Sequence, residues 1–243
     1  MLQNEFNSCQ ISPSCIWNAE HMSSFIGKYA GPIFETNKIS AELWLGTVER
    51  PSTSVLDTMM AHNNVKKYIK GVGFQWLGKN AVSGFHSSFP DLKIMQSYNE
   101  SGNGKNEWSA AEYSFQLMKQ YFNQGANTYI FYNAVLDESA KNAWGSRQNS
   151  LTTIDRRLKK LHFNPGYYLL KHFSYFVKPG AKKLLVNGSY NNVLAFLNSD
   201  NCIVIVAMND TDNAKNINIR ISDKELTLTM QAHSIHTLKT TEW

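Results

Sequence analysis

A change of hydrophobic pattern near residue 180 constrains the fold of this 243-residue chain more than any other feature. Before that point, helical and extended patterns alternate, which is typical of a parallel α/β protein. After it come short apolar runs bounded by Asn, Asp, Gly and Ser, which are typical of an antiparallel β-sandwich. The sequence therefore predicts two domains, residues 1–180 and residues 181–243, with a boundary near Lys178-Pro179-Gly180.

The first domain contains four candidate strands, each a buried apolar or β-branched run. They are residues 41–46, 72–76, 93–98 and 128–133. Helical patterns cover residues 19–36, 52–63 and 108–124, with a short helix or loop near 79–88. Asp155 with Arg156 and Arg157 is predicted to begin a further, solvated helix. Strands alternating with helices occur in part of a (β/α)8 barrel and also in a doubly wound sheet, so the pattern alone leaves both open.

The second domain contains six short candidate strands with turn residues between them. They are residues 183–186, 193–197, 202–208, 217–221, 226–230 and 234–238. This spacing predicts the antiparallel sandwich.

Charge and cysteine content exclude several classes of protein. The net charge of +5 is spread along the chain and its basic runs are short, so we expect no nucleic-acid partner. The three cysteines have no CxxC spacing, which predicts neither a zinc site nor a disulfide framework, although a Cys9–Cys15 bridge stays open. No apolar run has the length of a membrane span, and the chain begins without a signal peptide. We expect no metal and no cofactor.

Two short acidic motifs could carry chemistry. Hydrolysis of a glycosidic bond with retention needs two carboxyl groups about 5 Å apart, one as acid/base and one as nucleophile. In a barrel they lie at the carboxyl ends of strands. Gln3-Asn4-Glu5 and the segment from Ser97 to Gly102, which contains Glu100, fit this demand. Taken alone, each is more often a solvated turn.

Several motifs occur together in an order and spacing that resemble one known family. They are Gln3-Asn4-Glu5, Pro13 to Trp17, Leu43 to Pro51, Gly71 to Trp76, Met95-Gln96-Ser97, Tyr132-Asn133, Trp144-Gly145, Gln148-Asn149-Ser150 and Lys171 to Ala181. Together they resemble glycoside hydrolase family 30, which contains glucosylceramidases, β-1,6-glucanases and xylan-cleaving enzymes. The likeness extends over nearly the whole chain.

The resemblance implies roles for residues near the start of the chain and at the second strand. Glu5, in the Asn-Glu pair after strand four of the family's barrel, would be the general acid/base. Asn4 would hydrogen-bond the sugar 2-hydroxyl in the transition state. Gln75 and Trp76 match the end of strand six, which lines the sugar subsite.

The resemblance also implies a substrate role for three residues further along. Tyr132 and Asn133 match strand eight, where Tyr132 would form the aromatic floor of the subsite. Trp144, in the following loop, could form a further wall. Ordinary packing at a strand end is the alternative for all three.

One position departs from the family. The nucleophile should be a Glu directly after Ser97, and here that residue is Tyr98. A phenol ordinarily has a pKa of about 10, so little of it is ionised at neutral pH. Glu100 lies two residues on, on the same side of an extended strand but with its Cα displaced by about 6 to 7 Å. A sharp bend through Ser101-Gly102-Asn103-Gly104 could restore a nucleophile at Glu100.

The resemblance also implies that the chain is partial. Strands one to three, most of strand four and the N-terminal strand of the sandwich have no counterpart. The expected fold is therefore a partial (β/α)8 TIM barrel, strands four to eight, followed by a β-sandwich. We expect a fragment, a misassigned start or one part of a split protein with a missing N-terminal half. Family members are secreted or periplasmic.

Two functions follow from these observations. The first is a retaining β-glycosidase acting on a β-glucoside or a similar carbohydrate, with Glu5 as acid/base and Glu100 as nucleophile. The second is an inactive or truncated relative that only binds carbohydrate through its aromatic residues. Tyr98 and the missing strands favour the second function, and the many matching subsite residues favour the first.

Overall fold

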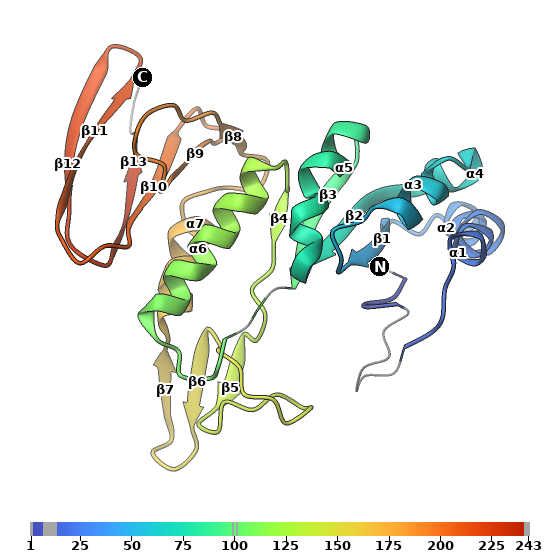
Figure 1. Cartoon of the computed structure of the whole chain (residues 1–243), viewed down its shortest axis with the longest axis horizontal. Coiled ribbons are helices and arrows are strands. Elements are labelled where there is room, and N and C mark those ends of the chain that lie inside the picture. Colours follow the sequence, from blue (N-terminus) through green and yellow to red (C-terminus); the bar gives the residue numbers. More distant parts are fainter. Residues whose placement is uncertain (1, 7–13, 99, 101, 241–243) are drawn as a thin grey trace. The chain divides into compact units, whose positions relative to one another are not determined.

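The computed structural model describes residues 2–6, 14–98, 100 and 102–240, which form two compact units (Figure 1). The first unit comprises residues 1–100 and 120–130, and the second comprises residues 101–119 and 131–243. The division passes through helix α6 (Trp108–Asn123). It differs from the boundary expected at residue 180, which stays a prediction.

The first unit has four strands and the helices that connect them. The strands are β1 (Leu43–Val48), β2 (Ile69–Gln75), β3 (Lys93–Tyr98) and β4 (Thr128–Tyr129). The helices are α1 (Ala19–Phe25), the π-helical turn η1 (Ile26–Ala30), α2 (Gly31–Thr36), α3 (Ser54–Met60), α4 (Asn63–Lys66), the 3-10 helix η2 (Trp76–Ala81) and α5 (Val82–Ser88). The last turn of α6 also belongs to this unit.

Strands β1 to β4 form one parallel sheet in chain order (Figure 1). Strand β2 is buried along almost its whole length, and its only exposed residue is Lys70. Strand β1 approaches it closely: a Cβ on Gly46 would lie 2.6 Å from the carbonyl oxygen of Gly73, and the φ of Gly46 is +113°. Glycine at position 46 therefore permits the contact between the two strands.

The core of this unit joins the sheet to its helices. Its members are buried apolar side chains such as Leu45, Val72, Phe74 and Ile94 from the strands and Tyr121 from α6. Parallel strands that follow one another in chain order place their connecting helices on one face of the sheet, and those helices cover the apolar side chains of that face.

Sequence and structure agree closely in this unit, with one clear difference. Strand β3 occupies the predicted residues 93–98, and the predicted helix 19–36 is a helix with a π turn in its middle. The predicted strand 128–133 was too long, because β4 ends at Tyr129. Asn133 has a φ of +64°, which no strand accommodates, and its amide donates to Gln148 and to the carbonyl of Asn149.

The second unit contains three antiparallel or mixed sheets and a helix. Its elements are β5 (Val135–Asp137), β6 (Thr152–Asp155), β7 (Lys160–Phe163), α7 (Pro165–Ser174), β8 (Lys182–Leu184), β9 (Val193–Leu197), β10 (Ile203–Asn209), β11 (Lys215–Ile221), β12 (Lys224–Met230) and β13 (Ser234–Lys239). The first turns of α6 complete the unit.

The six predicted strands after residue 180 are confirmed as β8 to β13. They form a four-stranded sheet in the order β13-β10-β9-β8 and a separate hairpin, β11-β12. One face of the larger sheet contacts α7, where His172 bonds Thr237 of β13. The other face contacts the hairpin through a small core of Ala207, Ile217 and Met230.

The small sheet of β5, β6 and β7 was not predicted. The expected helix start at Asp155 was wrong, since Asp155 ends β6 and its carboxylate accepts hydrogen bonds from the backbone of Arg157 and Leu158. Those bonds close the turn that leads into β7.

Candidate functional site

Polar and aromatic side chains meet at the carboxyl edge of the parallel sheet. Strand β2 ends at Gln75 and strand β3 ends at Tyr98, and these two residues are register partners. Parallel strands place their carboxyl ends at one edge, which is where barrel enzymes carry their active sites. The predicted residues of β2 and β3 are therefore neighbours.

Glu5 lies against the end of β2. Its Oε1 atom accepts one hydrogen bond from Gln75 Nε2 at 2.8 Å and another from Trp76 Nε1 at 3.1 Å. Gln75 is fully buried, so its amide is a fixed donor. The Oε1 atom of Gln75 is also buried and has no hydrogen-bond partner among the described residues. The structure therefore brings together three of the residues that the sequence singled out.

The end of β1 positions the Asn4-Glu5 pair. The Thr47 hydroxyl donates to Asn4 Oδ1 at 3.0 Å and accepts the backbone N–H of Glu5 at 3.2 Å. The Ser14 hydroxyl donates to the backbone carbonyl of Glu5 at 3.0 Å. Because Thr47 is only 1% exposed, it is a rigid anchor for a segment that has no regular secondary structure of its own.

Glu5 and Trp76 both have left-handed backbone conformations. Their φ angles are +49° and +47°. A bulky residue rarely adopts such a φ, and each such residue costs on the order of 1–3 kcal/mol unless its surroundings enforce it. Here the two strained residues are hydrogen-bonded to each other. Strain concentrated in this way is typical of binding and catalytic sites.

Tyr98 packs against the other side of this arrangement. Its ring meets the ring of Trp76 edge to face, with centroids 4.8 Å apart and an interplanar angle of 83°. Trp76 thus contacts Glu5 through its N–H and Tyr98 through its ring. Glu5 and Tyr98, the residue at which the resemblance predicts a nucleophile, therefore contact the same indole.

Glu100 forms an ion pair with Lys79 of η2. The Lys79 ammonium lies 2.7 Å from Glu100 Oε1, and the two side chains are 14% and 36% exposed. A half-buried pair of this kind is stronger than a surface pair, because water screens it less. Glu5 and Glu100 therefore contact different residues of the same segment, Gln75 and Trp76 in one case and Lys79 in the other.

Tyr132, Asn133 and Trp144 lie in the second unit. The Asn133 amide donates to Gln148 at 2.9 Å and to the carbonyl of Asn149 at 3.1 Å. These bonds give Asn133 a part in holding its own loop. Tyr132 is 38% exposed and Trp144 is 56% exposed, the latter on a turn whose backbone is capped by Asn142.

Sequence reasoning missed the residues that hold the site in place. Thr47 and Ser14 fix the Asn4-Glu5 segment, and Lys79 binds Glu100. Lys79 could have been predicted, because a lysine three residues after Trp76 lies near the same strand ends as the two carboxylates. Ser14 and Thr47 lie inside two of the motifs that carry the resemblance, but no local pattern predicts their contacts with Glu5, which span 9 and 42 residues of sequence.

In the described part of the chain, no cluster of three or more His, Cys, Asp or Glu side chains could hold a metal ion. Cys15 and Cys202 are free thiols there, and Cys9 lies outside the described residues. Within the same ranges, no helix combines the length and apolar character needed to cross a membrane.

Comparison with known families gives a match in the second unit. Residues 180–238 match the family described as the glycosyl hydrolase family 30 beta sandwich domain. A Caenorhabditis elegans protein described as putative glucosylceramidase 4 is 22% identical, over 91% of this chain and 47% of its own length. This chain spans about half the length of that relative.

Solved structures share the fold. The crystal structure of SrfJ from Salmonella typhimurium matches with a TM-score of 0.88 at 22% identity, covering 99% of this chain and 57% of that one. An endo-beta1,6-glucanase matches with a TM-score of 0.83 at 19% identity, covering 98% and 56%. These likenesses show a shared fold, with this chain corresponding to a part of the larger proteins. The match of residues 180–238 confirms the resemblance to glycoside hydrolase family 30 in the sandwich.

Proposed function

We propose that this chain acts as a glycoside hydrolase of the family 30 type on a β-linked glucoside, with Glu5 as the acid/base. The observation that carries the proposal is the pair of hydrogen bonds from Gln75 and Trp76 to one oxygen of Glu5, at the carboxyl edge of a parallel sheet. The names of two relatives, a glucosylceramidase and an endo-beta1,6-glucanase, support a glucoside as the substrate class. The partial (β/α)8 barrel stays part of this proposal.

The hydrogen bonds suggest which oxygen of Glu5 transfers the proton. Both donors bind Oε1, so we assign the proton to Oε2, which would pass it to the leaving oxygen of the glycoside. In the second step the same carboxylate would take a proton from water. Fixed donors hold the carboxyl group in one orientation, which reduces the entropy lost in reaching the reactive geometry.

Neighbouring side chains would bind the sugar. Asn4 Oδ1 accepts a bond from Thr47, which leaves its amide N–H2 as the donor for a sugar hydroxyl. The rings of Trp76 and Tyr98 offer apolar surface to the C–H face of a pyranose. Tyr132, Asn133 and Trp144 stay candidates for further sugar contacts. The amide of Asn133 also binds Gln148 within its own loop.

The nucleophile of this mechanism is assigned to Glu100. Lys79 binds Oε1 of Glu100, so we assign the attack on the anomeric carbon to the other carboxylate oxygen, Oε2. A glycosyl-enzyme intermediate on Glu100 would then be hydrolysed with Glu5 as base.

Binding without hydrolysis is the second candidate function. It is favoured by Tyr98 at the family's nucleophile position and by the Lys79–Glu100 ion pair, which ties up the substitute carboxylate. In that case the Glu5, Trp76 and Tyr98 surface would bind a glucoside and leave the bond intact. A secreted or periplasmic location, implied by the resemblance, stays a prediction for both functions.

Hydrolysis of aryl β-glucosides by the full chain tests the proposal. We expect the wild type to release p-nitrophenol, and Glu5→Gln to lower kcat/KM by at least 100-fold for an aryl glucoside with a poor leaving group. For a dinitrophenyl glucoside the first step should fall much less, because that leaving group needs no proton. Glu100→Gln should abolish turnover of both substrates.

Replacement of Tyr98 separates the two candidate functions. If only Tyr98→Glu turns over substrate, while Tyr98→Phe and the wild type bind glucoside without cleaving it, the native chain is a binding protein. Calorimetric titration with a β-glucoside measures that binding. If none of these folded proteins binds or cleaves the glucoside, both functions are refuted.

A further inference from the structure

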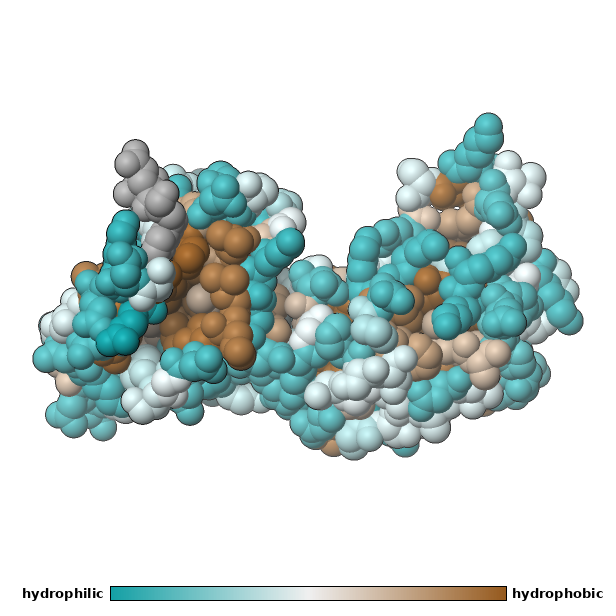
Figure 2. Space-filling view, turned by 90° about the horizontal axis from the view of Figure 1, so that it is seen from above, coloured by the Kyte–Doolittle hydropathy of each residue, from teal (hydrophilic) through white to brown (hydrophobic). Residues whose placement is uncertain are grey.

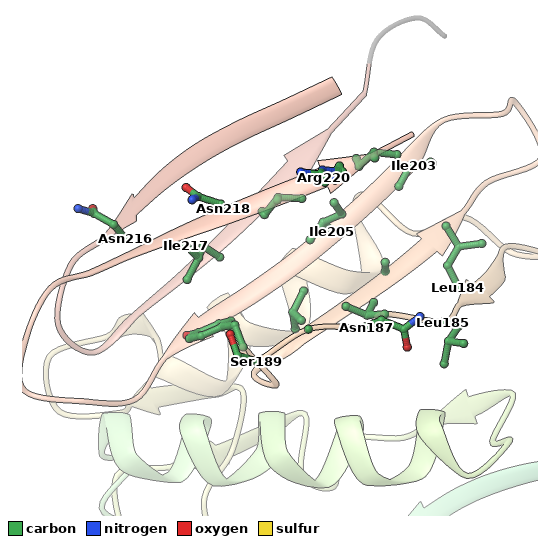
Figure 3. A pocket seen from close by; sticks show the side chains of 17 residues that line it. Leu184, Leu185, Asn187, Ser189, Ile203, Ile205, Asn216, Ile217, Asn218 and Arg220 are labelled. Atoms are coloured by element: carbon green, nitrogen blue, oxygen red, sulfur yellow. The ribbon is translucent and has the colours of Figure 1, made fainter. Parts of the chain in front are cut away.

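One exposed apolar surface of the second unit is a slot beside the hairpin β11-β12. The slot has a volume of about 560 Å³ and lies between β11 and the larger sheet, with Leu184 and Leu185 on the opposite wall (Figure 3). In the space-filling view, brown side chains gather over these sheets between teal rims (Figure 2). Among the residues that line the slot, Arg220 is the only charged one, and it donates to Glu225 at 2.6 Å. The lining is therefore apolar and contains no unpaired charge.

A different apolar surface lies on the hairpin of β6 and β7. These antiparallel strands are joined by the turn 156–159, at the end of the hairpin away from α7 (Figure 1). Leu158 in this turn is 62% exposed. Ile154 and Leu161 are directly opposite each other in the two strands, so their side chains lie on one face, where they are 43% and 54% exposed. The hairpin therefore presents three large aliphatic side chains to solvent.

Hydrogen bonds hold the turn, and Leu158 with it, in one conformation. The carboxylate of Asp155 accepts the backbone N–H groups of Arg157 and Leu158 at 2.9 and 2.8 Å. At the base of the turn, the Arg156 guanidinium donates to Glu138 at 2.9 Å. A turn fixed in this way keeps Leu158 in water, so an apolar environment brought to the turn is stabilised by the burial of that side chain.

Positive charge accompanies Leu158. Three exposed cations lie beside it in the sequence, and none of them forms an ion pair with a described residue. They are Arg157, Lys159 and Lys160. The nearby carboxylates are already engaged: that of Asp155 caps the turn. Those of Asp137 and Glu138, whose side chains are 30% and 28% exposed, bind Arg156. The outer end of the hairpin is therefore positive as well as apolar, which distinguishes it from the slot.

We propose that the β6-β7 hairpin docks on the surface of a lipid bilayer that contains anionic phospholipids. Leu158 enters the interface between headgroups and acyl chains, and the three cations bind the anionic headgroups. Long cationic side chains have aliphatic stems, so their charges stay at the headgroups while a neighbouring leucine lies deeper. Apolar insertion combined with positive charge is the pair of signals that stable attachment to a membrane surface needs. A soluble polyanion would use the cations and gain nothing from Leu158, so the exposed leucine favours the bilayer.

Co-sedimentation of the full chain with vesicles tests the proposal. The probe is a vesicle of phosphatidylcholine and phosphatidylserine in equal parts, and its control is a vesicle of phosphatidylcholine alone. Each cation near an anionic surface strengthens binding about fivefold, so three cations predict about 100-fold stronger partitioning into the mixed vesicles. A high salt concentration should weaken this binding, because salt screens the cations.

Variants at the turn separate the apolar contribution from the charge. We expect Leu158→Ser to weaken partitioning about tenfold, because it removes the side chain that enters the interface. The triple variant Arg157→Gln, Lys159→Gln, Lys160→Gln should weaken it about 100-fold. In Leu158→Trp, indole fluorescence should shift to shorter wavelength when mixed vesicles are added, relative to the same titration of the wild type.

Two matched variants control for general effects. Leu185→Ser removes a leucine of the slot that is 81% exposed, more than Leu158. A second triple variant, Lys28→Gln, Lys38→Gln, Lys66→Gln, lowers the net charge by the same amount through exposed lysines elsewhere. We expect each control to change partitioning less than about twofold. Circular dichroism confirms that each variant is folded.

Several results would overturn the proposal. They are failure of the folded wild type to sediment with mixed vesicles, equal binding to vesicles of phosphatidylcholine alone, equal weakening by the two triple variants, and undiminished binding by Leu158→Ser. Soluble heparin that binds the wild type and Leu158→Ser equally, and as tightly as the wild type binds mixed vesicles, would identify a polyanion as the partner, which also contradicts it.

Discussion

At the scale of single residues, Lys79 and Glu100 form the interaction on which the two candidate functions differ. Lys79→Met leaves a partly buried carboxylate without its cation, which typically costs about 1–3 kcal/mol. We expect the free energy of unfolding to fall by about that amount at pH 7, and the double variant with Glu100→Gln to recover part of it. Denaturant unfolding of the wild type, both single variants and the double variant measures the coupling. Additive effects would show that the ion pair contributes nothing.

Some contacts of the candidate site could be predicted from the sequence, and others could not. Gln75 and Trp76 were found because they lie at the end of a strand with a clear pattern, whereas Glu5 was identified from the Gln3-Asn4-Glu5 motif through the resemblance to a family. The contact between Trp76 and Tyr98 follows from the parallel register. The Lys79–Glu100 pair depends on the direction of side chains in η2 and after β3, which no hydrophobic pattern determines. The left-handed conformations of Glu5 and Trp76 are likewise set by tertiary contacts.

At the scale of elements, two histidines link parts of the second unit and should respond to pH in opposite ways. His233 lies between two carboxylates, Asp212 at 3.0 Å and Glu112 of α6 at 2.8 Å. Hydrogen bonds to Asp212 and then Glu112 raise the pKa of His233 above 6.5. Burial, followed by His236 and Lys171, lowers the pKa of His172 below 6.5.

These directions fix the sign of each contribution to stability. The charged His233 stabilises the fold fully below pH 6.5, and this contribution is lost as the pH rises through its folded pKa. His172 acts in the opposite sense, because the unfolded chain takes up its proton more readily, so acidification below pH 6.5 destabilises the fold. We expect His233→Gln to lower the thermal midpoint at pH 5.5 and to change it little at pH 9. NMR titration that finds His172 with the higher pKa would contradict the assignment.

Strong periodicity made most elements predictable, and its absence explains the rest. All six strands of the sandwich and helix α6 were predicted within a few residues. The sheet of β5 to β7 was missed because its strands have three or four residues each, and β7 is exposed throughout, which gives no alternation. Strand β4 was predicted too long because Tyr129, Ile130 and Phe131 suit a strand, whereas Asn133 ends the extended run by hydrogen bonding in its loop.

At the scale of the whole molecule, α6 belongs to both units and should couple their unfolding. Phe115 of α6 is fully buried in the second unit, next to Phe173, and Tyr121 of the same helix is fully buried in the first, next to Tyr129. Ser114→Pro removes a helical hydrogen bond and costs about 3 kcal/mol. We expect loss of amide protection in both β2 and β10, measured by hydrogen exchange and mass spectrometry.

A proline placed elsewhere provides the control. Thr227→Pro lies on the exposed strand β12, so any loss of protection should stay within the second unit. Protection lost in β10 alone after Ser114→Pro would show that the two units unfold independently despite sharing a helix.

The unfavourable torsion angles at Glu5 and Trp76 have an evolutionary consequence. Glycine would relieve the backbone at either position, so a lineage selected only for a folded protein gains by discarding both large side chains. Homologues that keep Glu and Trp at these two positions keep backbone conformations that lower the stability of the fold. If close homologues of this chain keep both residues, that would indicate continued selection for carbohydrate binding, whether or not the glycosidic bond is hydrolysed.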